Sequence, residues 1–281
     1  MDTSDRAGAP VPPGWTPAPA PAVLGALDDV AELGPWFAVP VLPVTPDPGW
    51  IRWDALYRPP SPGADPLSDR IDAVAASLRC GRREAASIAV QGMAARLVSF
   101  PLAAVALHRV LPGLGALHRR PAADDPWAPG LAAAPDSPDG SGAPAAAGTP
   151  DPVTDPAGAA DLLARELAAT HLEPLYAAVR ERVSVSERVL RGNAVSSIAG
   201  AARVLEPVRR TARPALVGLL DELVGHPALR GPLPGGATGR LLRLDPGDPD
   251  TEWSFRRRSC CLYVRVPGGG VCGDCVLTGR Q

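Results

Sequence analysis

Four of the five cysteines gather near the end of the chain, as Cys260, Cys261, Cys272 and Cys275 in the pattern Cys-Cys-x10-Cys-x-x-Cys. Random scatter of five cysteines over 281 residues would not produce such a cluster. Clustered thiols hold a metal or form disulfides. The group that these side chains bind therefore constrains the fold of residues 251–281 more than any other feature of the sequence.

The spacing of the cysteines favours a [2Fe–2S] cluster and leaves two alternatives open. A structural zinc ion is tetrahedral and usually takes two Cys-x-x-Cys arms. Cys260 and Cys261 fit that poorly, because neighbouring side chains on an extended chain point to opposite faces. A [2Fe–2S] cluster also takes four thiolates, but on two irons, so diverging neighbours suit it better. Disulfides are the third interpretation, and a reducing cytoplasm disfavours them.

The predicted location is the cytoplasm, with no membrane span. The first residues, MDTSDRAGAPVPPGW, have neither the basic start nor the apolar stretch of a secretory signal. The most apolar region, residues 87–111, is interrupted by Gln91, Arg96 and His108. Its longest charge-free piece, around residues 97–107, is too short to cross a bilayer. Gln91 and Arg96 face either a pocket or a hydrogen-bonded core position.

The absence of lysine excludes several classes of protein. All 28 basic residues are arginine, so a phosphate-binding Gly-Lys-Ser/Thr loop, a protein-kinase site and a pyridoxal-phosphate Schiff base are ruled out. No Gly-x-Gly-x-x-Gly follows a predicted strand, so no dinucleotide site is expected. The net charge of −2 argues against a nucleic-acid partner, which needs a broad basic face.

Composition and periodicity predict a mainly α fold whose body has two helical halves and ends in a small cluster-binding hairpin. Hydrophobic residues make up 46% but aromatics only 4%, so the core must consist of Ala, Leu and Val. Prolines and glycines, 35 and 29 of them, indicate long irregular stretches. We expect a flexible tail (1–22), an N-terminal helical half (23–120), a linker or insertion (121–158), a C-terminal helical half (159–250) and a cluster-binding segment (251–281). Within the linker, a short strand pair at 127–134 is an alternative to irregular structure.

Local signals place the helices within these halves. Asp65 and Pro66 predict a helix start, by an N-cap carboxylate followed by proline at the first helical position. Pro101 is expected to separate two helices, and Pro174 to interrupt another. Ser184 and Glu187 have the spacing of a capping box. Helices are expected at 22–33, from 66 to near 80–81, at 82–98, 101–111, 159–170 with a resumption to 183, across the buried positions 190–205, and at 214–224. A strand is expected at 262–266, followed by a turn at 267–270.

The C-terminal RRRSCCLYVRVPGGGVCGDC (256–275) is similar to the cluster-binding tail of the FhuF-like ferric siderophore reductases. Residues 83–107 and 171–205 resemble two helical regions of the same family, in the same order. The position before Gly-Asn that this family often gives to tryptophan is Arg191 here. The resemblance implies a [2Fe–2S] cofactor held by the four cysteines.

The resemblance further implies one-electron reduction of a ferric siderophore, with electrons from a separate ferredoxin or flavoprotein. Siderophore oxygens are hard donors that hold Fe(III) far better than Fe(II), so one electron releases the iron. Candidate substrate contacts lie in an arginine-rich stretch, 180–213, and beside the cysteines: Arg188, Arg191, Asn193, Arg256, Arg257 and Arg258. Each has a structural alternative, as a solvated charge or a packing residue. Two other functions remain open, an iron–sulfur sensor that regulates a partner and a zinc-stapled helical binding module.

Overall fold

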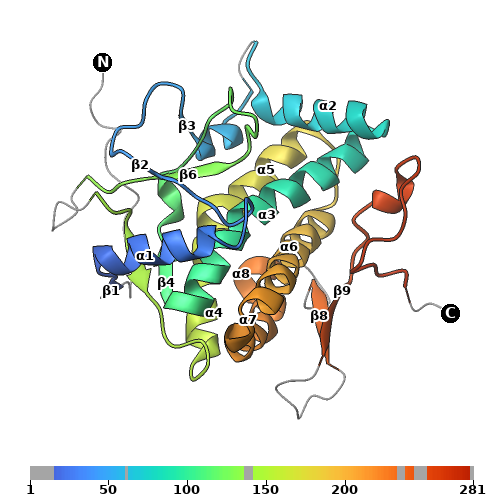
Figure 1. The fold of residues 1–281 in the computed structure, drawn as a ribbon. Coiled ribbons are helices and arrows are strands. Elements are labelled where there is room, and N and C mark those ends of the chain that lie inside the picture. The colour runs from blue at the N-terminus through green and yellow to red at the C-terminus, as the bar shows by residue number, and fades with distance from the viewer. Residues whose placement is uncertain (1–15, 61–62, 136–141, 233–237, 244–251, 279–281) are drawn as a thin grey trace.

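The structure is a computed structural model, and it describes residues 16–60, 63–135, 142–232, 238–243 and 252–278. It is mainly α, as predicted, with a strand hairpin near the C-terminus (Figure 1). The helices are α1 (Ala20–Ala31), α2 (Pro66–Leu78), α3 (Arg82–His108), α4 (Pro156–Leu167), α5 (Glu173–Arg182), α6 (Glu187–Val208), α7 (Arg213–Gly225) and α8 (Pro227–Arg230).

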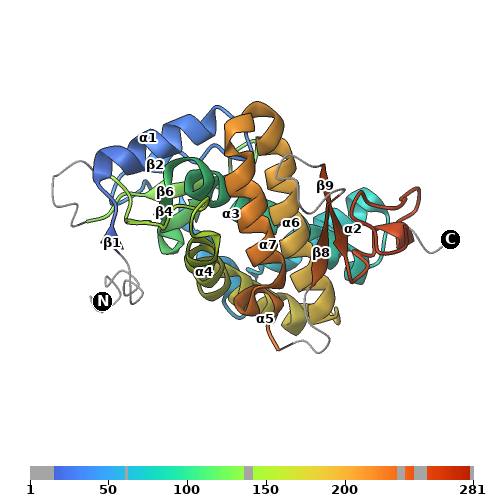
Figure 2. The ribbon, with the colours of Figure 1, turned by 90° about the horizontal axis from the view of Figure 1, so that it is seen from below.

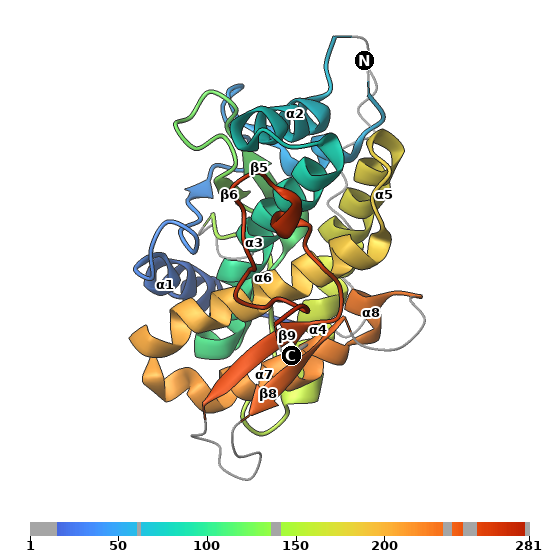
Figure 3. The same ribbon diagram turned by 90° about the vertical axis from the view of Figure 1, so that its right-hand side faces the viewer.

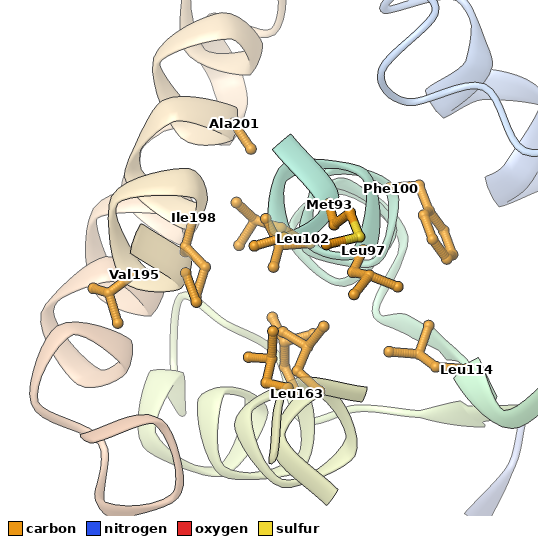
Figure 4. Close-up of a cluster of buried hydrophobic side chains, with 14 of the residues drawn as sticks. Met93, Leu97, Phe100, Leu102, Leu114, Leu163, Val195, Ile198 and Ala201 are labelled. Atoms are coloured by element: carbon orange, nitrogen blue, oxygen red, sulfur yellow. The ribbon is translucent and has the colours of Figure 1, made fainter. Parts of the chain in front are cut away.

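The centre of the fold is the pair α3 and α6, with α4 and α7 packed beside them (Figure 2). Both central helices carry many small residues, and Ala86, Ala89, Ala194 and Ala199 are almost fully buried. Small side chains let two helix backbones approach closely. Figure 4 shows the core where these helices meet, with Met93 and Leu97 of α3 near Ile198 of α6 and Leu163 of α4.

α3 is one continuous helix of 27 residues, although the sequence predicted a break at Pro101. Proline removes one helical hydrogen bond, but α3 is buried on all sides in this region, so packing outweighs the loss. By length and composition alone α3 is long and apolar enough to cross a membrane. However, 78% of its most apolar window is buried inside the protein. The apolar surface of α3 is therefore that of a core helix.

Two details of the second half also differ from the sequence predictions. The chain does not break at Pro174: α4 passes through a π-helical turn, Ala168–Leu172, into α5, and Pro174 sits in its first turn, where no N–H is needed. The N-cap of α6 is Ser186, so the capping box predicted from Ser184 is absent. The Glu187 carboxylate instead accepts hydrogen bonds from Arg180 and Arg191.

Short strands close the fold around the helices. They are β1 (Thr16–Pro17), β2 (Val41–Leu42), β3 (Ile51–Arg52), β4 (Val110–Pro112), β5 (Leu117–Arg119), β6 (Pro129–Ala132), β7 (Ala146–Gly148), β8 (Gly239–Arg243) and β9 (Trp253–Arg257). One sheet has the order β1-β7-β4 and a second the order β2-β6-β5-β3. β6 and β7 come from the region 121–158, where a linker or insertion was expected, and β1 from the expected tail. Buried residues of both helical halves form one continuous core.

The antiparallel pair β8 and β9 lies against α6 and α7 and leads into the cysteine segment, which runs over α3 and α6 (Figure 3). The strand predicted at residues 262–266 is absent: Tyr263–Arg265 form a 3-10 turn. Leu262 has a left-handed backbone with φ 69°, which ends any extended run.

Candidate iron–sulfur site

The four thiols lie on the loop that follows β9. Cys261 and Cys275 are buried, whereas Cys260 and Cys272 are partly exposed. The Sγ atoms of Cys261 and Cys272 are 3.5 Å apart. Two backbone N–H groups point at the other sulfurs: Leu262 donates to Cys260 Sγ at 3.3 Å and Leu277 to Cys275 Sγ at 3.4 Å. Such N–H···S contacts are among the interactions that tune an iron–sulfur cluster.

One pair of thiols has the spacing of two ligands on a shared metal. Two thiolates on one tetrahedral metal with bonds of about 2.3 Å lie roughly 3.8 Å apart, close to the separation of Cys261 and Cys272. Each iron of a [2Fe–2S] cluster held by four cysteines takes two thiolates from the protein.

Glycines shape the loop between the two halves of the motif. Gly268 has φ 73°, a conformation that side chains rarely adopt. A Cβ on Gly269 would lie 2.3 Å from the carbonyl oxygen of Tyr263, so only glycine fits there. The glycine run thus turns the chain back and brings Cys272 to Cys261.

Polar side chains on the two central helices anchor this loop. Ser87 of α3 donates its hydroxyl to the carbonyl oxygen of Cys261 at 2.7 Å. Asn193 of α6 donates Nδ2 to Ser87 O at 2.6 Å and to Ser87 Oγ at 2.9 Å. Its Oδ1 accepts from Nη2 of Arg257 in β9. One buried chain of hydrogen bonds therefore links both helices, β9 and a cysteine backbone.

A second anchor holds the other end of the motif. Asp274, between Cys272 and Cys275, accepts from Ser196 Oγ at 2.5 Å and forms an ion pair with Arg203. The Asp274 carbonyl accepts the backbone N–H of Arg257 at 3.0 Å. The sequence patterns did not indicate a role for Ser87 or Ser196. The feature that could have revealed them is a hydroxyl group among the small apolar residues of a central helix.

Cys261 and Cys272 share one proton in this structure. The hydrogen bond between the two thiols lowers the pKa of Cys261 to about 6 and raises the pKa of Cys272 well above its usual range. The Tyr263 N–H and the charge of Arg257 also lower the pKa of Cys261, and burial opposes this shift. A metal takes both sulfurs as thiolates, so binding it displaces this shared proton.

Three of the predicted substrate contacts are buried and have structural partners. Arg191 forms ion pairs with Glu173 at 2.6 Å and Glu187 at 2.7 Å, and its side chain is only 2% exposed. Asn193 and Arg257 belong to the buried chain of hydrogen bonds described above. Burial and these partners favour the structural alternative that the sequence left open for Arg191, Asn193 and Arg257.

The other three arginines are closer to the surface. Arg188 and Arg258 are exposed, and Arg256 is partly buried. Arg256 donates to the carbonyl oxygen of Thr278, so it ties down the chain after the last cysteine. None of the three lines the pocket that adjoins the cysteine loop.

That pocket has a volume of about 530 Å³ and lies between α3, α6, residues 33–37 and the start of the second cysteine pair. Cys272 itself forms part of its wall, together with Gly273 and Asp274. The pocket is lined mainly by apolar and small residues. Polar groups come from Gln91, which the sequence placed either at a pocket or in the core, and from serines and Arg203.

Trp36 lines the pocket, and its indole ring packs against an arginine side chain. The Arg96 guanidinium lies 3.9 Å from the centre of the indole ring. Arg96 also donates to Pro35 O at 2.6 Å and pairs with Asp125. Of the two alternatives stated for these residues, Arg96 is a hydrogen-bonded core residue, whereas Gln91 lines the pocket. Nothing in the sequence around Trp36 predicted its position beside the cysteines.

Fold and site together define a mainly helical iron–sulfur protein whose four thiols lie on one C-terminal loop. Residues 257–277 match the family model described as the FhuF 2Fe-2S C-terminal domain. This match confirms the resemblance of the C-terminal segment and the [2Fe–2S] cofactor, which replaces the zinc alternative. Comparison of the chain with curated proteins and with solved structures gives no match.

Proposed function

We propose that this protein is a ferric siderophore reductase of the cytoplasm, which uses Cys260, Cys261, Cys272 and Cys275 to hold the cluster. The observation that supports it best is the position of Cys272. This expected cluster ligand lines a pocket of about 530 Å³, within the size range of small-molecule sites. A substrate in the pocket would therefore touch a ligand of the redox centre.

The reaction balances as two one-electron steps. A separate donor, a ferredoxin or a flavoprotein, delivers one electron to the oxidised protein. The cluster supplies the one-electron chemistry when bound. One electron then passes to the bound ferric complex, which becomes a ferrous complex, and the weakly held Fe(II) dissociates from the hard oxygen donors.

The residues of the pocket suit a chelate that presents both apolar and polar surface. Trp36 and the small side chains of α3 and α6 offer a flat apolar wall. Ser99, Ser196 and Ser197 supply hydroxyl groups, and Arg203 supplies a guanidinium next to Cys272 and Asp274. These groups orient the chelate, while the cluster ligand faces its iron.

The electron donor has a separate place to dock, on the outer side of the cysteine loop. Tyr263, Val264, Val271 and Leu277 are all exposed apolar side chains of this loop. Arg265 lies beside them and is also exposed. An apolar patch with basic neighbours suits an acidic electron-transfer protein, because complementary charge speeds the encounter of two proteins.

Two glycines allow the pocket to be filled without disturbing the fold. Gly92 of α3 and Gly200 of α6 both line it, and a Cβ on either would meet no atom within 4 Å. We expect Gly200→Leu to keep the cluster and the helix but to block the chelate. Gly25→Leu in α1 is the matched control, because Gly25 is exposed, equally free of contacts and outside the pocket.

The test starts from anaerobic protein reduced with dithionite and freed of excess reductant. Mixed with ferric hydroxamate, catecholate and carboxylate chelates, it should regain its oxidised visible spectrum and release Fe(II), which a ferrous-specific chelator traps. Gly200→Leu should slow this reaction at least tenfold, and Gly25→Leu should not. Ferricyanide, a small oxidant, should reoxidise all three proteins equally. Absence of reoxidation by every ferric chelate, in protein with a full cluster, would refute the proposal.

A further inference from the structure

Arg257 is a buried cation without a carboxylate partner. It is 1% exposed, and Nη2 donates to Asn193. Its Nε and Nη1 are also buried, and neither has a hydrogen-bond partner within the described ranges. Arg191, which is 2% exposed, has two glutamates on its guanidinium. Arg119, which is 4% exposed and also lacks an ion pair among the described residues, has its guanidinium 5.0 Å from the centre of the Trp127 ring. Within the described ranges Arg257 has neither kind of partner beside its guanidinium.

A buried charge is strongly unfavourable unless an opposite charge compensates it. None of the ion pairs among the described residues involves Arg257. Around it lie the Ser259 side chain, Gly192 and the Asp274 backbone, all uncharged groups of the cysteine segment or of α6. The Asp274 carboxylate is bound by Arg203 and Ser196. The four cysteines follow Arg257 on the same segment, and cysteines bind metal as negatively charged thiolates.

Hydrogen bonds tie this cation to both parts of the cysteine motif. The backbone N–H of Arg257 donates to the carbonyl oxygen of Asp274, between Cys272 and Cys275. Asn193, which accepts from Arg257 Nη2, is bonded to Ser87, whose hydroxyl donates to the carbonyl oxygen of Cys261. The Sγ atoms of Cys261 and Cys272 are 3.5 Å apart, and Cys272 borders the pocket.

We propose that Arg257 is the built-in counter-charge of the [2Fe–2S] cluster and raises its reduction potential. Two ferric ions, two sulfides and four thiolates carry two negative charges in sum, and one-electron reduction adds a third. A fixed cation in a dry site stabilises the more negative, reduced form. Such a charge is screened far less than one on the surface.

Asn193 is the positioning residue for this cation. Its Oδ1 holds Arg257, and its Nδ2 is fixed by Ser87 on the neighbouring helix. Gly192 makes room for it, because a Cβ there would lie 3.3 Å from Arg257 Nη2. The Gly-Asn pair, a poor choice for the middle of a helix, thereby acquires a physical reason.

The test measures the midpoint potential of the cluster, by redox titration with electron paramagnetic resonance of the reduced form. In Arg257→Met the ratio of reduced to oxidised cluster at a fixed potential should fall at least tenfold, a shift of 59 mV to more negative values. Arg257→Lys keeps the charge and should fall less than tenfold. Arg256→Gln removes an equal charge from the next residue of β9, which is less buried, and should give the smallest shift.

A second variant keeps the proposal testable even if Arg257→Met does not hold its cluster. Asn193→Asp is isosteric and places a carboxylate against Arg257, so it neutralises the cation without removing it. Its potential should also shift to more negative values by 59 mV or more. An unchanged potential in Asn193→Asp, or equal shifts in Arg257→Met and Arg256→Gln, overturns the proposal. Iron and sulfide are counted in every variant. The inference depends on the cluster and not on its substrate, so it can fail while the reductase proposal stands.

Discussion

Gly192→Ala is the most informative single substitution in the contact between α6 and the cysteine segment. In an open helix this change would stabilise by about 1 kcal/mol, because alanine is a far better helix former than glycine. Here the new Cβ would lie 2.3 Å from Ser259 Oγ and 3.3 Å from Arg257 Nη2. Overpacking of this kind costs about 1–3 kcal/mol. We therefore expect a net loss of stability of about 1 kcal/mol, concentrated where the cysteine loop rests on α6.

A second substitution separates the clash from every other effect. In Ser259→Ala the remaining side-chain atom of residue 259, Cβ, is 3.7 Å from the added Cβ of residue 192, so only the looser 3.3 Å approach to Arg257 Nη2 is left. Alone, Ser259→Ala removes the hydrogen bond from its hydroxyl to the carbonyl oxygen of Arg188, 3.0 Å long, at a cost of about 1 kcal/mol. The double variant should lack the clash, so its coupling energy should be favourable by about 1–3 kcal/mol.

The assay is thermal unfolding of anaerobic, cluster-loaded protein, followed by circular dichroism and by the loss of visible absorbance. For a chain of this size 1 kcal/mol corresponds to about 2–4 °C in the apparent Tm. Gly192→Ala should bleach and unfold earlier than wild type, and the double variant should regain the difference. Gly200→Ala in the same helix meets no atom within 4 Å and should raise the Tm. Equal Tm values for Gly192→Ala and Gly200→Ala, or simple additivity in the cycle, would contradict the reasoning.

Three further predictions concern the body of the protein. His171 donates Nε2–H to Leu114 O and accepts from Tyr57, and burial lowers its pKa to about 4. Because this pKa is below the usual value of 6.5, the unfolded chain binds more protons than the folded protein between pH 6.5 and 4. The free energy of unfolding therefore falls by up to about 3 kcal/mol as the pH is lowered over this range. Urea titrations should show a weaker pH dependence in His171→Gln. Arg191→Met removes the Arg191 ion pair of Glu173 and leaves Glu187 with Arg180 alone, so it should cost about 2 kcal/mol in the same titrations, whereas Arg191→Lys should cost less. Cys80→Ser should leave iron and sulfide counts unchanged, because Cys80 lies just after the C-terminal end of α2 and outside the cysteine loop. Loss of the cluster in this variant would contradict the prediction.

The helical body illustrates how far local sequence patterns reach. The N-cap Asp65, with Pro66 behind it, starts α2 as predicted, and Asp65 Oδ1 accepts from the Ser68 N–H. The error at Pro101 has the opposite origin. Local chemistry disfavours proline inside a helix by about 3 kcal/mol, and burial of α3 on all sides outweighs it. A local sequence pattern therefore predicts the N-cap at Asp65, but it does not predict the burial that keeps α3 helical at Pro101.

The C-terminal segment shows the same division within the site. The Cys-Cys-x10-Cys-x-x-Cys spacing indicated the cofactor, because ligands of one cluster that come from one loop leave a local pattern. The strand predicted at residues 262–266 was wrong, since Leu262 adopts a left-handed backbone that alternation of residues does not reveal. The arginines next to the cysteines were noticed, but their roles diverge: Arg257 turns inward to Asn193, whereas Arg258 is exposed.

The amino-acid sequence alone indicated the mainly helical class and, through the cysteine spacing together with the family resemblance, the [2Fe–2S] cofactor, because these depend on composition or on ligands close together in the chain. The pocket beside Cys272 and the buried chain from Ser87 through Asn193 to Arg257 required the tertiary structure. Ser87 and the Cys261 carbonyl are 174 positions apart, and Asn193 and Ser87 are 106 apart. Contacts over such distances are set by how α3 and α6 pack, and no local pattern records that packing.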